Sequence, residues 1–219
     1  MRTRVLVVLA MALLSACAFA VDGVILINQA TVIAAGGFPY KITQPGSYKL
    51  SGNLTMNTTA QGNLNGIDVA IAISSSNVSL DLNGFTITVN DLIGQTLGHA
   101  FYAIAETGAL TQISIVNGLV RMTSIWNREI ITAINFPDSL VMKFEELNLV
   151  ALQPILDIAP PQARLLQAGG DSFVHHVVAA GAILLRCPST AVDNIGFVSG
   201  TGTGCIIINN SPSLFVPTL

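Results

Sequence analysis

The residues best suited to chemistry lie in a charged stretch near the middle of the chain. Arg121, Trp126 and Arg128 could together hold an acidic sugar, because aromatic faces stack on sugar rings and arginine pairs with carboxylates. The other charged members of the stretch are Glu129, Asp138, Lys143, Glu145 and Glu146. A solvated, irregular loop has the same composition, so two interpretations stay open: a carbohydrate contact and an ordinary exposed face.

Paired carboxylates for glycoside hydrolysis, which lie about 5–10 Å apart in such enzymes, are not evident. Glu145 and Glu146 are adjacent, and adjacent side chains of a strand point to opposite faces. In the alternating segments, the outward positions are expected at Ala70, Ala72, Ala103 and Ala105. The sequence therefore predicts no catalytic residue and favours a non-catalytic protein.

His175 and His176 are the residues that most suggest metal or base chemistry. In a strand they would diverge, one toward the core and one toward water. Aligning the segment 173–177 with the segment 191–195 places His176 level with Asn194 and favours a structural hydrogen-bonding role. We therefore expect no metal site here. A phosphate loop, a Ser-His-Asp motif and a dinucleotide fingerprint are also absent from the sequence.

The segment 1–20 has the pattern of an export signal. Arg2 and Arg4 precede an apolar run, Val5–Leu14, that is shorter than the roughly 20 residues of a membrane span. Ala18-Phe19-Ala20 is an A-x-A cleavage site, which predicts a secreted, periplasmic or cell-surface protein. The alternative is a lipobox ending at Cys17, which would anchor the chain to a bacterial membrane by a lipid.

In an exported protein, Cys187 and Cys205 are candidates for a disulfide. The alternative is two separately buried thiols. A zinc site is not expected, because these two cysteines lack the paired C-x-x-C spacing. A disulfide here would tie the penultimate repeat to the last one.

The composition indicates a folded chain that does not bind nucleic acid. Of 219 residues, 51% are hydrophobic and 10% are charged, whereas disorder requires few apolar residues and a high net charge. The formal net charge of −3 provides no basic excess to neutralise phosphates. No later segment is long and apolar enough to predict a transmembrane span.

The elements that must position these residues are short strands. The segment 70–87 contains three alternating apolar runs separated by bends, and the Asn-Gly pair at Asn83 recurs at Asn117. Further on, Ala182-Ile183 recurs as Cys205-Ile206. Repeats of about 20–50 residues without helices favour a β-solenoid over a propeller. The amides expected at its corners are Asn83, Asn117 and Asn194.

Several segments resemble exported bacterial right-handed parallel β-helix proteins of the broad pectate-lyase-like superfamily. They are Val21–Gln29, Gln44–Leu54 and Val78–Ile87, with Cys187-Pro188 and Gly204–Asn210 near the end. The segment 122–165 departs from the pattern. The resemblance implies an all-β, right-handed parallel β-helix after a signal-peptide helix. Enzymes of the superfamily that act on acidic polysaccharides use aspartate-bound calcium with an arginine or lysine base, or paired carboxylates.

We therefore expect a signal peptide (1–20), leading and capping strands (21–66), β-helix coils (67–210) and a C-terminal tail (211–219). The predicted function is that of an exported, non-catalytic protein with a structural or carbohydrate-contacting role and no cofactor. The alternative is a polysaccharide lyase or glycoside hydrolase, with calcium only in the lyase case. Ile206–Asn210 end the last coil, whose open edge predicts either that the tail lies over it or that the chain self-associates there.

Overall fold

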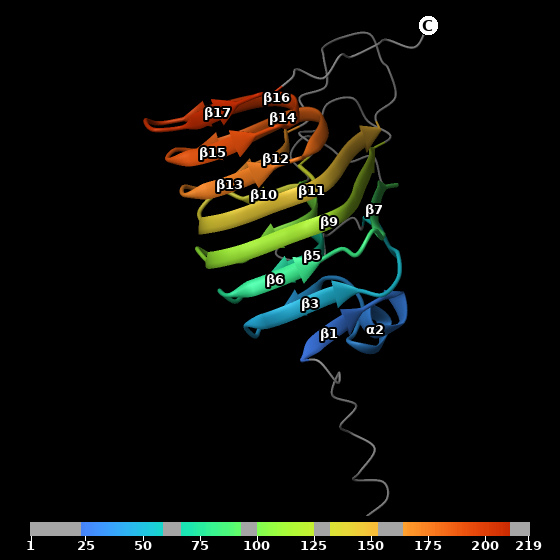
Figure 1. The fold of residues 1–219 in the computed structure, drawn as a ribbon. Coiled ribbons are helices and arrows are strands. Elements are labelled where there is room, and N and C mark those ends of the chain that lie inside the picture. The colour runs from blue at the N-terminus through green and yellow to red at the C-terminus, as the bar shows by residue number, and fades with distance from the viewer. Residues whose placement is uncertain (1–22, 59–66, 93–99, 125–131, 153–163, 211–219) are drawn as a thin grey trace, which may run out of the picture.

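The computed structural model describes residues 23–58, 67–92, 100–124, 132–152 and 164–210, except the side chains of residues 164, 180, 181, 196 and 197. The described chain forms 17 strands and one short helix, and all of the strand pairings found in it are parallel (Figure 1). The expectation of an all-β chain is confirmed.

The strands stack in three columns. The first column consists of β1 (Val24–Ile27), β3 (Gly46–Leu50), β6 (Val78–Asp81), the first halves of β9 (Thr111–Ser124) and β11 (Leu140–Leu152), β13 (Ser172–His175), β15 (Ser189–Val192) and β17 (Ile206–Ile208). This column carries the candidate site.

The other two columns complete each pass of the chain. The second consists of β4 (Leu54–Asn57), β7 (Thr86–Asp91), the second halves of β9 and β11, and the first residues of β14 (Val178–Arg186) and β16 (Ile195–Thr201). The third consists of β2 (Tyr40–Ile42), β5 (Asp68–Ile73), β8 (Phe101–Glu106), β10 (Ile134–Phe136), β12 (Arg164–Ala168) and the later parts of β14 and β16.

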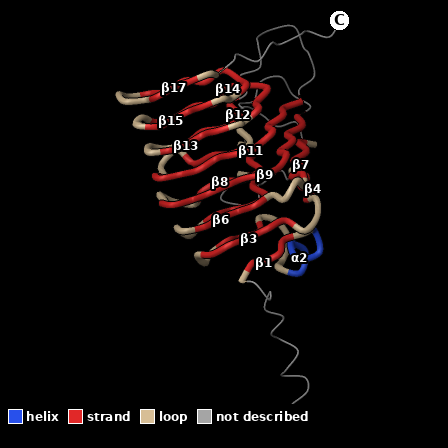
Figure 2. The backbone as a smooth tube through the Cα atoms, viewed as in Figure 1, coloured by secondary structure: helices blue, strands red, loops and turns tan. Residues whose placement is uncertain are grey.

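The chain passes through the three columns in the same order each time, and one pass is called a coil here. Each strand pairs with the strand one coil later, so like positions lie one above another (Figure 2). Early coils are long, since the paired residues Asn57 and Asn90 are 33 residues apart in the sequence. Late coils are short, since the paired residues Ser172 and Ser189 are only 17 residues apart.

Both repeat alignments made from the C-terminal sequence are wrong. His175 pairs with Val192 and not with Asp193, so His176 lies level with Asp193 and not with Asn194. The other repeat joined residues of different columns, because Ile183 lies in the third column and Ile206 in the first. Short coils of apolar residues align with one another in several registers, and only backbone pairing selects one.

The interior is filled by side chains stacked along each column. In the first column the stack runs through Leu80, Ile115, Phe144, Val174 and Ala191, and each of these is fully buried. Strands of one column lie about 4.8 Å apart, so each apolar side chain contacts the like side chain of the next coil. Burial of this continuous apolar column is the main stabilising term for the fold.

The alanines expected to face water are all buried. Ala70 and Ala103 pack in the main core. The backbone N–H groups of Ala103 and Ile104 both donate to the carbonyl of Ala133, at 3.0 and 3.1 Å, and this irregularity shifts the alternation of faces by one residue. The remaining two, Ala72 and Ala105, lie in a separate small cluster with Val69 and are also buried.

The helix α2 (Gln29–Ala34) lies beside β1 at the N-terminal end of the stack (Figure 1). Asn28 and Thr31 form a capping box, in which each side chain accepts a hydrogen bond from the other residue's backbone N–H, at 3.0 and 2.8 Å. Val32 is fully buried and packs on the core. The sequence analysis expected strands alone in this region, and the Asn28-x-x-Thr31 spacing was the signal it did not use.

At the other end, the last strand β17 leaves all three of its isoleucines exposed, with exposed fractions of 46–52%. The predicted signal peptide, the lipobox cysteine Cys17 and the predicted tail 211–219 lie outside the described residues. Among the helices of the described chain, none has the length and apolar character needed to cross a membrane.

Candidate functional site

The corner between the first and second columns has the same design in successive coils. Its first residue adopts a left-handed backbone conformation, with φ between 49° and 70°, at Asn117, Glu146, His176, Asp193 and Asn209. This conformation ends the alternation of strand side chains and turns the backbone within two residues. It occurs here also at Glu146, whose residue type, unlike Asn, Asp and His, is not enriched in this conformation.

The second corner residue points inward. Leu147, Val177 and Asn194 occupy this position, and each is no more than 1% exposed. At Gly118 a side chain has no room, because a Cβ atom there would lie 2.9 Å from the carbonyl oxygen of Phe85. In the coils of β11, β13 and β15, the corner therefore buries one residue and projects the preceding one outward.

Asn194 satisfies the polar groups of this buried position. Its side-chain oxygen accepts from the N–H of Val177 at 2.8 Å, and its side-chain nitrogen donates to the carbonyl of Val174 at 3.1 Å. The same nitrogen donates to the side-chain oxygen of Asn210 at 2.8 Å. The buried amide thus links three successive coils, so its role here is structural.

Asn83 and Asn117 lie at the corners of the earlier coils. Both have left-handed backbone, with φ of 53° and 70°. The side-chain nitrogen of Asn83 donates to the carbonyl of Leu50 at 3.1 Å, and that of Asn117 donates to Asp81 at 3.3 Å. These amides make contacts between coils, not with each other.

Two histidines meet at the corner of the coil that contains β13. The rings of His175 and His176 are stacked, with centroids 3.7 Å apart and an interplanar angle of 25°. The expectation that they point to opposite faces is wrong, because the left-handed backbone of His176 ends the strand alternation. Both side chains lie at the surface, with exposed fractions of 27% and 48%.

Carboxylates from the neighbouring coils surround the two rings. Nδ1 of His176 lies 3.0 Å from Oε1 of Glu146, one coil earlier. Nδ1 of His175 lies 3.6 Å from Oε1 of Glu145, and its Nε2 lies 3.8 Å from Oδ2 of Asp193, one coil later. One ligand atom from each of His175, His176 and Asp193 falls within 4.8 Å of the others. The arrangement suits cation binding.

Lys143 keeps Glu145 ionised. Its Nζ lies 2.6 Å from Oε2 of Glu145, and this hydrogen bond lowers the pKa of Glu145 below its usual value. The positive charge of Lys143 acts in the same direction, and burial opposes both effects. The imidazoles therefore face a carboxylate whose negative charge is already paired with a lysine.

Phe173 extends the aromatic surface along β13. It lies two residues before His175 on the outward face, with ring centroids 5.7 Å apart, and is 37% exposed. Phe173, His175 and His176 form a row of three rings, called here the aromatic row. Lys143 pairs with Phe173 across the strands, and Glu145 pairs with His175, so charged groups flank the row.

The carbohydrate candidates of the sequence analysis lie elsewhere. Arg121 is exposed on the second column, with Thr88 and Val150 as its cross-strand neighbours. Trp126, Arg128 and Glu129 lie outside the described residues. Asp138, by contrast, lies 3.9 Å from Arg186 in an exposed ion pair. Within the described chain, Arg121 and the aromatic row belong to different columns.

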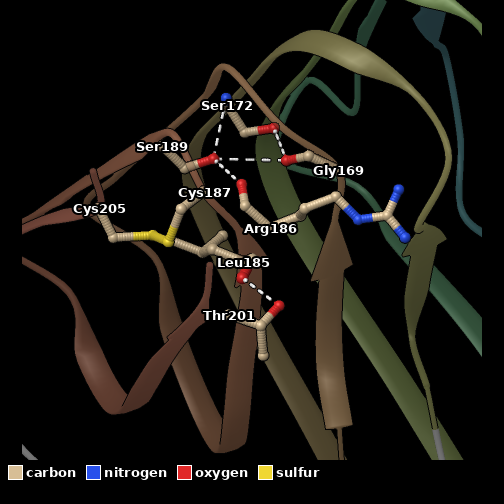
Figure 3. The surroundings of a disulfide bond; sticks show 8 residues. All are labelled: Gly169, Ser172, Leu185, Arg186, Cys187, Ser189, Thr201 and Cys205. Carbon is tan, nitrogen blue, oxygen red and sulfur yellow. Dashed lines mark hydrogen bonds between the residues drawn. A yellow bond between two sulfur atoms is a disulfide. The ribbon is translucent and has the colours of Figure 1, made fainter. Parts of the chain in front are cut away.

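Cys187 and Cys205 form a disulfide whose Cα atoms are 5.0 Å apart (Figure 3). Gly200 lies against it, and a Cβ at this position would be 2.5 Å from Sγ of Cys205. Beside the bond, the hydroxyl of Ser189 accepts from the N–H of Ser172 at 3.1 Å and donates to the carbonyl of Arg186 at 2.6 Å (Figure 3). The disulfide fixes the last two short coils.

A half-buried carboxyl group lies at the end of β8, away from the histidines. Burial raises the pKa of Glu106, and hydrogen bonds from the Ser139 hydroxyl and the Asp138 N–H oppose that effect. Ser139 is fully buried and also accepts from the N–H of Leu110 at 3.0 Å. The group joins two coils through hydrogen bonds.

Sequence reasoning missed the meeting of His175 and His176 with Asp193. Nothing in the linear pattern links the histidines to Asp193, and the alignment with the segment 191–195 moved Asp193 away from its partners by one position. An alignment shorter by one position would have placed His176 level with Asp193. No family model, curated protein or solved structure matches this chain.

Proposed function

We propose that this chain is an exported, right-handed parallel β-helix protein with a non-catalytic, carbohydrate-contacting role. The N-terminal pattern of the segment 1–20 supports export, and the Cys187–Cys205 disulfide suits an oxidising compartment outside the cytoplasm. Successive parallel strands joined by crossover connections are right-handed in about 98% of cases, which supports the hand of the helix.

The observation that carries the carbohydrate contact is the aromatic row. Phe173, His175 and His176 present three rings on the outward side of the first column, and sugars bind to such rings through their apolar faces. Lys143 and Glu145 beside the row supply a cation and an ionised carboxylate, groups that can hydrogen-bond sugar hydroxyls. A surface of this kind suits a polysaccharide segment lying along β13.

The test is a glycan array with the purified chain, followed by titration of the sugars that bind. Phe173→Ala is expected to weaken binding about 2- to 12-fold, which corresponds to the roughly 0.5–1.5 kcal/mol of an aromatic contact. Leu152→Ala is the control, because it also removes an exposed apolar side chain, on the second column. Equal binding by both variants and the unchanged chain would contradict the proposal.

A separate incubation tests the enzyme alternative. Incubation with oligogalacturonides or alginate, with and without calcium, followed by detection of unsaturated sugar ends, separates a binding protein from a lyase.

Mass spectrometry of the mature N-terminus distinguishes cleavage after Ala20 from lipidation of Cys17. Light scattering of the chain with Ile207→Lys, compared with the unchanged chain, tests self-association at the exposed edge of β17.

A further inference from the structure

The corner cluster, which consists of His175, His176 and Asp193, has the ligand set of a transition-metal site. We propose that His175, His176 and Asp193 bind one borderline divalent metal ion, of which Zn²⁺ is the best match. Two imidazoles and one carboxylate are the donors that such ions prefer, and three protein ligands leave a coordination position for water. The sequence analysis expected no metal here, because it placed the two histidines on opposite faces.

The distances are close to those of a bound ion. The three ligand atoms lie within 4.8 Å of one another, whereas zinc bonds of about 2.0–2.2 Å place ligand atoms roughly 3.3 Å apart. The side chains of His175, His176 and Asp193 are 27%, 48% and 42% exposed. Because the lone pair of each imidazole lies in the plane of its ring, binding of one ion by both histidines requires the stacked rings to turn about their side-chain bonds.

The carboxylates of the preceding coil orient the imidazoles for this role. Glu146 lies at hydrogen-bond distance from Nδ1 of His176, and Glu145 lies on the Nδ1 side of His175. A proton on each Nδ1 leaves the lone pair of each Nε2 free to bind an ion. Nε2 of His175 already faces Asp193. Carboxylate–histidine–metal arrangements of this kind fix the tautomer and ring orientation of metal-binding histidines.

The backbone holds the ligands in place before any ion arrives. His176 and Asp193 occupy the same left-handed corner position in adjacent coils, with φ of 49° and 52°. The parallel pairing of β13 with β15 fixes the distance between these coils, so the site does not depend on a mobile loop. The residues that follow them, Val177 and Asn194, are buried in the interior and so fix the backbone at both positions.

The charges around the site favour a dication. Glu146 and Asp193 contribute two carboxylates, whereas the charge of Glu145 is offset by Lys143, whose Nζ lies 2.6 Å from Oε2 of Glu145. Calcium and magnesium prefer oxygen ligands throughout, so a site with two imidazoles discriminates against them. The metal site shares His175 and His176 with the aromatic row, whereas Asp193 belongs only to the metal site and Phe173 only to the row, so variants of these two residues test the two proposals separately.

The test is isothermal titration of the disulfide-intact chain with Zn²⁺ alone. One ion is expected to bind per chain, and His176→Ala and Asp193→Asn are each expected to weaken binding at least tenfold. Asp171→Asn is the matched control, because Asp171 is also exposed and left-handed, with φ of 53°, but lies at the opposite end of β13. His99→Ala controls for binding by the remaining histidine.

Two further variants sharpen the assignment. Glu146→Gln keeps a hydrogen-bond acceptor but removes the charge, and loss of such an orienting group typically weakens metal binding about 10–100-fold. Phe173→Ala should leave the zinc affinity unchanged even where it weakens sugar binding. Circular dichroism of every variant confirms that the fold is retained.

The outcomes are decisive in both directions. Weaker binding by His176→Ala, Asp193→Asn and Glu146→Gln, with normal binding by the two controls, supports the site. Absence of zinc binding by the unchanged chain overturns it, and so does equal binding by the ligand variants. Loss of binding in His99→Ala instead places the ion elsewhere and overturns it as well. Calcium binding that competes with zinc contradicts the assigned metal class.

Discussion

The early and late coils of this protein reach the same stacking by different means. Around β6 the corner spans four residues, Leu82–Phe85, because Asp81 pairs with Val116 and Thr86 with Leu119. Around β13 the corner spans two residues, and the coil is so short that Ser172 pairs with Ser189, only 17 residues later. The late coils carry the disulfide and the histidine cluster.

This difference shows where a short coil can place polar chemistry. With few residues outside its strands, a late coil offers outward positions mainly on its short strands and at the left-handed corner. A short coil also buries fewer apolar atoms, as the core stack shows by changing from Leu80 in the early part to Ala191 in the late part. The disulfide adds stability where the core adds less.

The largest expected effect is in the core of the early coils. Leu80→Ala removes a fully buried side chain and is expected to lower the free energy of unfolding by about 2–5 kcal/mol. Val174→Ala removes fewer buried atoms from the same stack and is expected to cost less. Urea denaturation measures both, and a greater cost for Val174→Ala would contradict the view that the late core contributes less.

The disulfide is expected to matter next. Replacement of both Cys187 and Cys205 by serine should lower the free energy of unfolding by about 3 kcal/mol, from the loop entropy of a link with a sequence separation of 18. The loss should concentrate in the late coils. Hydrogen exchange is expected to become faster in β15–β17 while exchange in β3 and β6 keeps its rate. Uniformly faster exchange would show that early and late coils unfold as one unit.

The buried amide of the late corner comes third. Asn194→Ala leaves the N–H of Val177 and the carbonyl of Val174 without their partner, which costs about 1–3 kcal/mol. Asn90→Ala is the control, because its side chain donates to Asn57 at 3.1 Å on the exposed face of the second column. Thermal unfolding that ranks Asn90→Ala as the more harmful change would contradict the structural role of Asn194.

The smallest effect concerns pH and the early region. Burial raises the pKa of Glu106, so the folded state favours its protonated carboxyl group. This stabilisation is fully present below the pKa that Glu106 has in the unfolded chain. That contribution is lost as the pH rises through the folded pKa. Glu106→Gln is therefore expected to gain stability relative to the unchanged chain between pH 4 and pH 7, as read from melting temperatures at both values. An opposite trend would mean that the hydrogen bonds from Ser139 and Asp138 outweigh burial.

The sequence was informative where side chains repeat in simple alternation. It predicted three alternating apolar runs in the segment 70–87, where β5, β6 and the start of β7 lie. It placed the corners that carry asparagine, since Asn83 and Asn117 both have a left-handed backbone. It did not place the corners at Glu146 and His176, because neither lies in an Asn-Gly pair.

Register between distant coils was also beyond the sequence. Alanines and isoleucines align equally well in several offsets. The irregularity at Ala103 also places two consecutive residues, Ala103 and Ile104, in the core and so reverses the alternation of faces after them. The contact between Asp193 and the two histidines depends on that register, so the candidate site needed coordinates, whereas the Cys187–Cys205 pairing depended only on two cysteines in neighbouring coils.

The left-handed corner residues from Asn117 to Asn209 make a vertical line of side chains whose spacing is set by backbone hydrogen bonds and not by their own identity. A substitution at any point of that line changes the chemistry of one coil and leaves the neighbouring coils in place. New binding groups can therefore be introduced one coil at a time, at a fixed pitch of about 4.8 Å. A repeating polymer of matching geometry is the kind of partner that such a line can follow.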